Sequence, residues 1–237
     1  MFDLLLAWFN ENGRDLPWRR TRDPYEILVS EVMLQQTQVE RVVPYYRAWL
    51  KRWPTATALA AAPVADVIRA WQGLGYNRRA VNLHRAAQKI AGAGWPDDLT
   101  ELPGVGRYTA DAVARFAFDS PVLPVDSNVR RVQERTGASF SPPAAHALMD
   151  LGATICIARV PRCGSCPLAT DCPSRGRRYE PLRRQSRFEG SFRQRRARAL
   201  RLVAEQPREM PSMDGDVVAA LARDGLVRID GDLVSLP

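Results

Sequence analysis

The chain of 237 residues has only two histidines and two lysines, and no apolar run approaches the roughly 20 residues that a membrane-spanning helix needs. The histidines, His84 and His146, are too few and too far apart for a histidine metal site, and we expect both in ordinary helices. The apolar N-terminus, MFDLLLAWFN, lacks a basic leader and a small-residue cleavage site, so it is not typical of a signal peptide. Its spacing predicts an amphipathic helix instead.

Because Lys51 and Lys89 are the only lysines, nearly all of the positive charge comes from arginine. Basic residues number 34 against 26 acidic ones, which gives a net charge of +8 at pH 7. A surplus of this size favours an anionic partner, with nucleic acid first, and a general basic bias of the source proteome is the alternative. The hydrophobic share of 46% and the charged share of 25% are ordinary for a soluble globular protein.

The first 120 residues show helical rather than alternating apolar spacing, in segments that proline and glycine separate. The predicted helical segments are residues 27–43, 45–53, 56–62, 64–71 and 78–90. No strand signal precedes the C-terminal end, so the sequence predicts an all-α body.

The composition changes between Ser174 and Arg201, where arginine is abundant and apolar residues are scarce. This stretch is typical of a solvated connector that leads into a basic helix. Beyond it we expect helices at 197–204 and 214–222, and the alternation around Asp230-Gly231 predicts a β-hairpin. Two helices and a hairpin are compatible with a small winged-helix-like module.

The only four cysteines fall within 17 residues, in the pattern C-x6-C-x2-C-x5-C; they are Cys156, Cys163, Cys166 and Cys172. Without a secretion signal we do not expect disulfides, and four thiolates this close predict a metal site. Both zinc and a [4Fe–4S] cluster accept four thiolates. Only one pair has the tight spacing that is common in zinc sites, and the wider loops favour the bulkier cluster. The arginines around the cysteines indicate a loop that also presents positive charge to DNA.

The stretch LPGVGRYTADAVARFAF, residues 102–118, places Gly104 and Gly106 between two helical segments. Glycine allows a sharp turn and a close approach to a ligand. The two glycine amides, together with Arg107 at the start of the next helix, are suited to hold a phosphate oxygen. A plain helix–turn–helix corner is the alternative, but the flanking residues favour a helix–hairpin–helix that binds the DNA backbone.

Two carboxylates stand out. Glu31, in SEVMLQQTQV, is predicted on the apolar side of a helix, with Gln35 and Gln38 on the same strip. Asp126, in PVLPVDSNVRRV, precedes a helix, where an aspartate is also the preferred N-cap. Two carboxylates beside a sugar–base bond can divide glycosidic cleavage between proton donation and stabilisation of the cationic sugar. An apolar setting raises a carboxyl pKa and keeps the group protonated for donation.

Taken together, the hairpin, the aspartate motif and the cysteine tail resemble the helix–hairpin–helix DNA glycosylase superfamily in its iron–sulfur branch. Within that branch SEVMLQQTQVERVVPYY, LPW, WQGLGYNRRAVNLHRAA and MDLGATIC are similar to the MutY adenine DNA glycosylases, over residues 2–180. The resemblance implies an all-α, two-lobed fold with a [4Fe–4S] loop and the small C-terminal winged-helix-like tail as an addition. It also implies removal of adenine mispaired with 8-oxoguanine or guanine from double-stranded DNA, by a monomer in the cytoplasm at the nucleoid.

The resemblance assigns catalytic roles to four residues. Glu31 matches the acid that protonates the adenine ring, and Asp126 matches the aspartate that stabilises the oxocarbenium-like sugar. Asn128 matches a polar residue near the same site, and Tyr108 matches an active-site tyrosine of part of the family. Endonuclease III-type lyases have a lysine at that position, whose amine forms a Schiff base. Tyr108 cannot form one, so the resemblance implies a monofunctional enzyme with water as the nucleophile.

Four further residues match the family's contacts with DNA. Gln36 and Tyr76 match residues that enter the duplex around the lesion pair, since adenine must leave the stack before it can react. Arg14 and Trp18 match the N-terminal edge of the base pocket. Trp18 and Tyr76 have an alternative interpretation as aromatic residues of the core.

The sequence also departs from the family. Only 50 residues follow Arg187, too few for the nucleotide-pyrophosphatase-like domain that commonly reads 8-oxoguanine, and SFSPP replaces additional helix before MDLGATIC. The expected domains are a six-helix domain at 18–123, a cluster domain at 1–17 and 124–180, a basic linker at 181–192 and the C-terminal module at 193–237. A T(U)/G mismatch glycosylase on the same scaffold and a non-catalytic iron–sulfur DNA-binding protein are the alternative functions.

Overall fold

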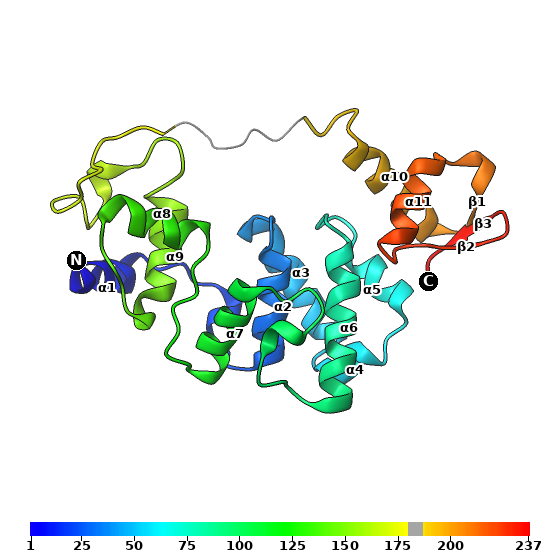
Figure 1. The fold of residues 1–237 in the computed structure, drawn as a ribbon, viewed down its shortest axis with the longest axis horizontal. Coiled ribbons are helices and arrows are strands. Elements are labelled where there is room, and N and C mark those ends of the chain that lie inside the picture. Colours follow the sequence, from blue (N-terminus) through cyan, green and yellow to red (C-terminus); the bar gives the residue numbers. More distant parts are fainter. Residues whose placement is uncertain (180–186) are drawn as a thin grey trace. The chain divides into compact units, whose positions relative to one another are not determined.

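The computed structural model describes residues 1–179 and 187–237. The described residues form two compact units, one of residues 1–24 with 106–179 and one of residues 25–105 with 187–237 (Figure 1). The two units meet after residues 24 and 105, whereas the predicted domain boundaries lie after residues 17 and 123. The predicted domains themselves stay a prediction. Half of the predicted linker, residues 181–186, lies outside the described residues.

The first unit consists of helices around a small apolar core. Its helices are α1 (Phe2–Asn12), α7 (Arg107–Phe118), α8 (Ser127–Thr136) and α9 (Ala145–Thr154), with short 3-10 turns η1 (Pro17–Arg19), η3 (Pro142–Ala144) and η4 (Cys163–Ser165). Helix α9 packs against both α1 and α8. Leu5 of α1 is fully buried in the core that Val129, Leu148 and Leu151 also form, which confirms the predicted N-terminal helix.

The second unit begins with five helices, α2 (Pro24–Leu34), α3 (Val39–Arg52), α4 (Ala56–Ala60), α5 (Val64–Trp71) and α6 (Arg78–Ala93), followed by the 3-10 turn η2 (Leu99–Glu101). Helices α4 and α5 both pack on α6. Helix α2 is buried on every face from Ile27 to Met33, which is typical of a central core helix rather than a surface one.

Two predicted helix boundaries are wrong. The segment predicted as one helix over 27–43 is interrupted, because α2 ends at Leu34 and α3 begins at Val39. Pro44 does not separate two helices but lies inside α3. The interruption at residues 35–38 contains neither glycine nor proline, so its cause lies in contacts from elsewhere in the unit.

The C-terminal module, residues 192–237, contains two helices and a small sheet, as Figure 1 shows in orange and red. Its elements are α10 (Phe192–Glu205), β1 (Arg208–Glu209), η5 (Met210–Ser212), α11 (Gly215–Arg223), β2 (Arg228–Asp230) and β3 (Leu233–Ser235). The antiparallel sheet has the order β1-β3-β2. Asp230 pairs with Leu233 across the turn, which confirms the predicted hairpin, whereas β1 was not predicted.

The C-terminal module shares a hydrophobic core with α5 and α6. Leu200, Val203 and Leu221 of the module are buried with Ile68 of α5 and Val81 of α6. The Arg69 Nε atom also donates a hydrogen bond to the Ala204 carbonyl, at 3.1 Å. The module is therefore packed onto this unit through an apolar interface and not through polar contacts alone. None of the helices among the described residues is long and apolar enough to cross a membrane.

Candidate active site

Glu31 lies in the middle of α2 and is only 6% exposed. Its neighbours Ser30 and Val32 are buried as well, and the Ser30 hydroxyl is satisfied by the Ile27 carbonyl at 2.8 Å. The predicted burial of Glu31 on α2 is thus confirmed. A carboxyl group removed from water in this way is costly to ionise unless a hydrogen-bond donor or a positive charge compensates its negative charge.

The glutamines after Glu31 do not share its helical strip, so that part of the prediction is wrong. Because α2 ends at Leu34, Gln35, Gln36 and Gln38 lie in the loop before α3. Gln35 is half-buried, and Gln38 is exposed at the N-cap of α3. Gln36 is exposed, with a left-handed backbone at φ +58°.

The Arg79 guanidinium, from the first turn of α6, holds the end of α2. Its Nη1 atom donates to the carbonyls of Val32 at 2.7 Å, Met33 at 2.9 Å and Gln35 at 2.6 Å. These carbonyls belong to the C-terminal end of α2, where a positive charge is favourable. Burial lowers the pKa of Arg79 to about 10, which leaves it charged at neutral pH.

The other edge of the Arg79 guanidinium holds the loop that carries Tyr76. Its Nη2 atom donates to the Gly75 carbonyl at 2.9 Å and to the Thr37 hydroxyl at 3.0 Å, and its Nε atom donates to the Tyr76 carbonyl at 3.3 Å. One buried side chain therefore joins the loops at 35–38 and 74–77. The sequence analysis missed Arg79, although an arginine on the apolar face that Leu83 and Ile90 occupy was a usable signal.

Gln36 and Tyr76, the residues predicted to enter the duplex, share an unusual backbone. Tyr76 has φ +47°, and with Gln36 and Asp119 it is one of three non-glycine residues at positive φ in the part of the chain that the structure describes. Such conformations cost about 1–3 kcal/mol and persist where the surroundings enforce them. Tyr76 is 49% exposed, so its alternative interpretation as a core aromatic is wrong.

The predicted phosphate-binding hairpin begins with a turn of the type II pattern. The Val105 amide donates to the Leu102 carbonyl at 3.0 Å, and Gly104 at the third position has φ +79°. A Cβ atom at Gly104 would also meet the Asn82 side chain at 2.7 Å, so glycine is required twice over. Gly106 is the N-cap of α7, is exposed, and has no atom that would meet a Cβ there. Its surroundings leave room for a ligand.

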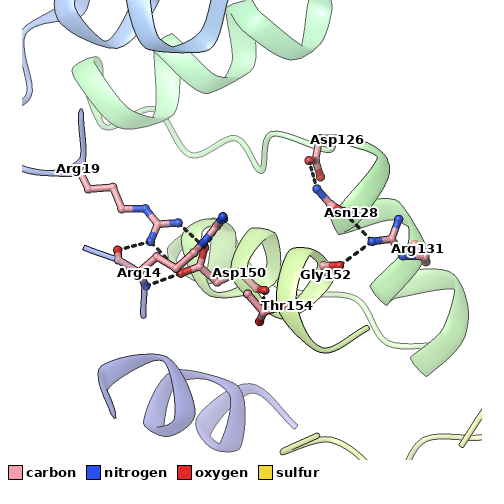
Figure 2. A network of polar contacts seen from close by, with 8 residues as sticks. All are labelled: Arg14, Arg19, Asp126, Asn128, Arg131, Asp150, Gly152 and Thr154. Carbon is pink, nitrogen blue, oxygen red and sulfur yellow. Dashed lines mark hydrogen bonds and ion pairs between the residues drawn. The ribbon is translucent and has the colours of Figure 1, made fainter. Parts of the chain in front are cut away.

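Asp126 is the N-cap of α8, and both of its carboxylate oxygens accept hydrogen bonds, of which Figure 2 shows the one from Asn128. Oδ1 accepts from the Val129 amide at 2.7 Å, and Oδ2 accepts from the Asn128 side-chain amide at 2.9 Å. The Asn128 oxygen in turn accepts from Arg131 at 2.6 Å, and Arg131 also donates to the Gly152 carbonyl at 2.6 Å. The capping interpretation is confirmed, and it fixes the carboxylate within a network of defined geometry.

The Arg131 side chain extends this network to the cysteine segment. Its Nε atom donates to the Cys156 carbonyl at 2.7 Å, and burial lowers the pKa of Arg131. A Cβ atom at Gly152 would meet the Asn128 Cβ atom at 2.6 Å, so glycine in MDLGATIC allows α8 and α9 to approach closely. The position of Asn128, and through it Asp126, thus depends on α9 and on the first cysteine. Arg131 and Gly152 were both missed as positioning residues.

Arg14 does not stand free at the edge of a pocket; it is bound to Asp150 of α9 together with Arg19 (Figure 2). The Asp150 side chain is 1% exposed, and each guanidinium approaches it to 2.7 Å. Burial acts to raise the pKa of Asp150, but hydrogen bonds from Arg19 and Arg14 outweigh it and hold this pKa below its ordinary value. Trp18, between the two arginines in sequence, is 8% exposed, as its core alternative predicts.

Tyr108 lies in the first turn of α7 and is half-buried, and Arg107 beside it is exposed and paired with Asp111 at 3.0 Å. The lysines have other positions. Lys89 forms an ion pair with Glu101 at 2.8 Å, and Lys51 is exposed in the last turn of α3.

The four cysteines line one cavity in the first unit. Burial raises the pKa of the Cys166 thiol, and the three neighbouring cysteines act in the same direction. Arg135 places its guanidinium 3.5 Å from the Cys156 sulfur and stacks on Tyr179 at 3.8 Å. Across residues 1–179 and 187–237, no three His, Cys, Asp or Glu side chains converge closely enough to bind a single metal ion.

Comparisons with known proteins agree with this geometry. The model of the HhH-GPD superfamily of base excision DNA repair proteins matches residues 29–152. Adenine DNA glycosylase of Mycolicibacterium smegmatis is 44% identical in an alignment of 246 positions, gaps included, that covers 90% of this chain and 84% of that protein. Human adenine DNA glycosylase is 39% identical and covers 73% of this chain, although only 39% of the human protein is matched.

Solved structures show the same fold. A thermostable thymine-DNA glycosylase superposes with a TM-score of 0.65 at 28% identity, over 72% of this chain and 93% of that one. A trapped endonuclease III–DNA covalent intermediate superposes with a TM-score of 0.63 at 25% identity, over 72% of this chain and 92% of that one. The family model matches more than half of the chain, and the identity to the mycobacterial enzyme extends over 90% of it. The chain therefore belongs to the HhH-GPD superfamily and, within it, to the MutY-type adenine DNA glycosylases.

Proposed function

We propose that this protein is a monofunctional DNA glycosylase of base excision repair, which removes adenine mispaired with 8-oxoguanine or guanine. One observation carries the proposal: a carboxyl group, Glu31, buried in the central helix of a chain that is 44% identical to a named adenine DNA glycosylase. Burial favours the protonated carboxyl, which is the form that a general acid needs.

Glu31 donates a proton to the adenine ring and makes the base a leaving group. The carboxylate of Asp126 stabilises the positive charge that develops on the sugar as the glycosidic bond breaks. The hydrogen bonds from Val129 and Asn128 support this role, because they fix both oxygens before the charge appears. Water then attacks the sugar, since Tyr108 offers no amine and both lysines lie elsewhere.

Two groups of residues bind the duplex: one positions the DNA backbone, and the other extrudes the base. Gly104, Gly106 and Arg107 bind a phosphate at the start of α7, which the exposed turn supports. Gln36 and Tyr76 enter the duplex around the mispair while adenine leaves the stack. Trp18 forms the N-terminal edge of the base pocket, and Arg14 positions that edge through its ion pair with Asp150.

Cys156, Cys163, Cys166 and Cys172 hold a [4Fe–4S] cluster. The cavity that all four cysteines line supports this assignment, because a [4Fe–4S] cluster is bound by four thiolates. A bound cluster would tie the loop together and favour the thiolate form of Cys166, whose thiol pKa is raised first by burial and then by the neighbouring cysteines. Iron and inorganic sulfide content, measured against zinc content in the purified protein, tests the assignment. Residues 1–17 and 124–180 form the domain around this cluster, and the C-terminal module is a small winged-helix-like domain.

The decisive experiment offers the enzyme duplexes with adenine opposite 8-oxoguanine or guanine, and reveals abasic sites with alkali. We expect release of adenine by the wild type and a loss of about 10²–10⁴-fold in single-turnover rate for Glu31→Gln. Glu26→Gln, in the first turn of the same helix, is the matched control and is expected to keep the rate. Excision by Glu31→Gln at the wild-type rate contradicts the proposal.

A second candidate is a glycosylase for T or U opposite G, which the likeness to a thymine-DNA glycosylase and the presence of Tyr108 favour. Duplexes that carry T·G and U·G mispairs, placed in the same assay, separate the two functions. Release of T or U with no release of adenine supports the second candidate. Borohydride trapping of either lysine on DNA contradicts a monofunctional mechanism.

A further inference from the structure

A groove of about 980 Å³ lies in the second unit, between the loops that carry Gln36 and Tyr76 and helix α10 of the C-terminal module. Its volume is at the upper end of the roughly 300–1,000 Å³ of small-molecule pockets. Such pockets are mostly apolar, whereas this groove is lined largely by glutamine, asparagine and arginine. Its composition suits a charged polymer better than a small apolar ligand.

The charge of the groove is strongly positive. The arginines that line it are Arg41, Arg78, Arg79, Arg193, Arg196 and Arg201. Asp224 is the one carboxylate among the described lining residues, and it is already paired with Arg196 and, at 3.6 Å, with Arg78. Arg79 is occupied by backbone carbonyls.

Two lining arginines, from α3 and α10, remain available to a ligand. Arg41, on α3, is exposed, and its hydrogen bond to the Gly73 carbonyl is long, at 3.5 Å. Arg201, on α10, is exposed and forms no ion pair with any residue that the structure describes. Phe188, which is 47% exposed, adds an aromatic face of the kind on which nucleic-acid bases stack.

We propose that this groove binds the sugar–phosphate backbone of the DNA duplex beside the mispair, with Arg41 on one wall and Arg201 of the C-terminal module on the other. The inference rests on the proposed function, because Gln36 and Tyr76 line the same groove and are the residues assigned to enter the duplex. The shared core of Leu200, Val203 and Ile68 holds α10 in place for this contact. The C-terminal module is thus a DNA-binding element and not only a stabilising extension.

The test measures the salt dependence of binding to an A·G duplex for the full-length wild type and for Arg41→Ala and Arg201→Ala. Each lost phosphate contact lowers the slope of log K against log salt by about 0.9, which is roughly an eight-fold loss of affinity at 0.1 M salt relative to 1 M. Arg198→Ala is the matched control, because Arg198 is exposed on the same helix but does not line the groove. We expect its slope to equal that of the wild type.

Two further arms sharpen the outcome. Arg201→Lys keeps the charge and is expected to restore most of the slope that Arg201→Ala loses, which separates a phosphate contact from a folding defect. Neutral methylphosphonate linkages, placed beside the mispair on one strand at a time, are expected to abolish the difference between the wild type and Arg201→Ala on the strand that the groove holds.

The proposal is overturned if Arg201→Ala keeps the wild-type slope, if Arg198→Ala loses as much, or if no linkage beside the mispair removes the difference. Failure of the proposed function is a separate result: a wild type that binds the duplex but releases no base refutes the glycosylase assignment and leaves the slopes interpretable.

Discussion

Replacement of Arg79 tests whether one buried guanidinium positions both loops that face the DNA. Arg79 is 8% exposed and joins the end of α2 to the loops at 35–38 and 74–77. Gln36 and Tyr76 in those loops hold positive φ angles that cost about 1–3 kcal/mol each. Without the guanidinium, we expect the loops to relax toward ordinary backbone conformations.

The expected loss of stability follows from the contacts. Four hydrogen bonds from Arg79 to carbonyls, those of Val32, Met33, Gln35 and Gly75, are 2.9 Å or shorter. A hydrogen bond to a charged group is worth about 1.5–3 kcal/mol, but water that enters the space left by Arg79→Ala satisfies part of the carbonyls. We therefore expect a loss of about 3–5 kcal/mol, as for other disrupted buried charged contacts. Arg79→Lys, with one compact ammonium group, retains some of these contacts and loses less.

Urea unfolding measures the stability, and the fluorescence of 2-aminopurine as the target base reports its extrusion from the stack. Arg79→Lys is expected to fold, to bind the duplex and yet to give a smaller fluorescence rise and a slower single turnover. Arg85→Ala is the control on the same helix; Arg85 is exposed, so its loss changes stability by no more than about 0.5 kcal/mol.

A purely structural role for Arg79 predicts a different result. In that case Arg79→Lys loses stability, but below its unfolding midpoint it extrudes the base as the wild type does. Equal extrusion and equal turnover by the folded variant refute the reasoning that links Arg79 to Gln36 and Tyr76.

Three further predictions concern other parts of the chain. Burial, followed by the nearby charge of Arg19, lowers the pKa of His146 to about 4. The free energy of unfolding therefore falls, by at most about 3 kcal/mol, as the pH falls from about 6.5 toward 4. Urea unfolding of His146→Leu across this range is expected to show a smaller loss. Asn128→Ala frees one Asp126 oxygen and is expected to slow excision while the affinity for the duplex is kept. A loss of affinity as large as the loss of excision rate contradicts a positioning role. Gly104→Ala meets the Asn82 side chain and a strained φ, so it is expected to weaken binding to matched and mismatched duplexes alike in a titration.

Local patterns were sufficient for the N-terminal helix, for the C-terminal hairpin and for the burial of Glu31. Apolar spacing predicted the N-terminal helix and the burial of Glu31, and Asp230-Gly231 predicted the hairpin, because each depends on neighbours within a few residues. The break at residues 35–38 was not predictable in this way. Glutamine is a good helix former, and the chain leaves the helix where Arg79, more than 40 residues later, binds the carbonyls that the next turn would have used.

The same limit explains why Asp150 was missed. Its partners Arg14 and Arg19 lie more than 130 residues away in the sequence, and a motif such as MDLGATIC shows a charged residue on an apolar helix face without naming what neutralises it. That a buried carboxylate needs a compensating partner can be predicted from the sequence. Which residue supplies the opposite charge depends on which segments pack together, here α9 and the segment that follows α1.

For Asp126, helix capping and catalysis are compatible roles, although the sequence analysis weighed one against the other. Capping uses Oδ1, through the Val129 amide, and Asn128 holds Oδ2. An N-cap aspartate is rotationally fixed by the same hydrogen bond that stabilises its helix, and a catalytic carboxylate must be fixed before charge develops on its substrate. A functional carboxylate at a helix start therefore loses little additional conformational entropy, because the capping bond that stabilises α8 also sets the direction of the carboxylate. Asp126→Asn separates the roles: it retains an oxygen for the cap, so stability is expected to change by less than about 1 kcal/mol, whereas excision is expected to be lost with the negative charge.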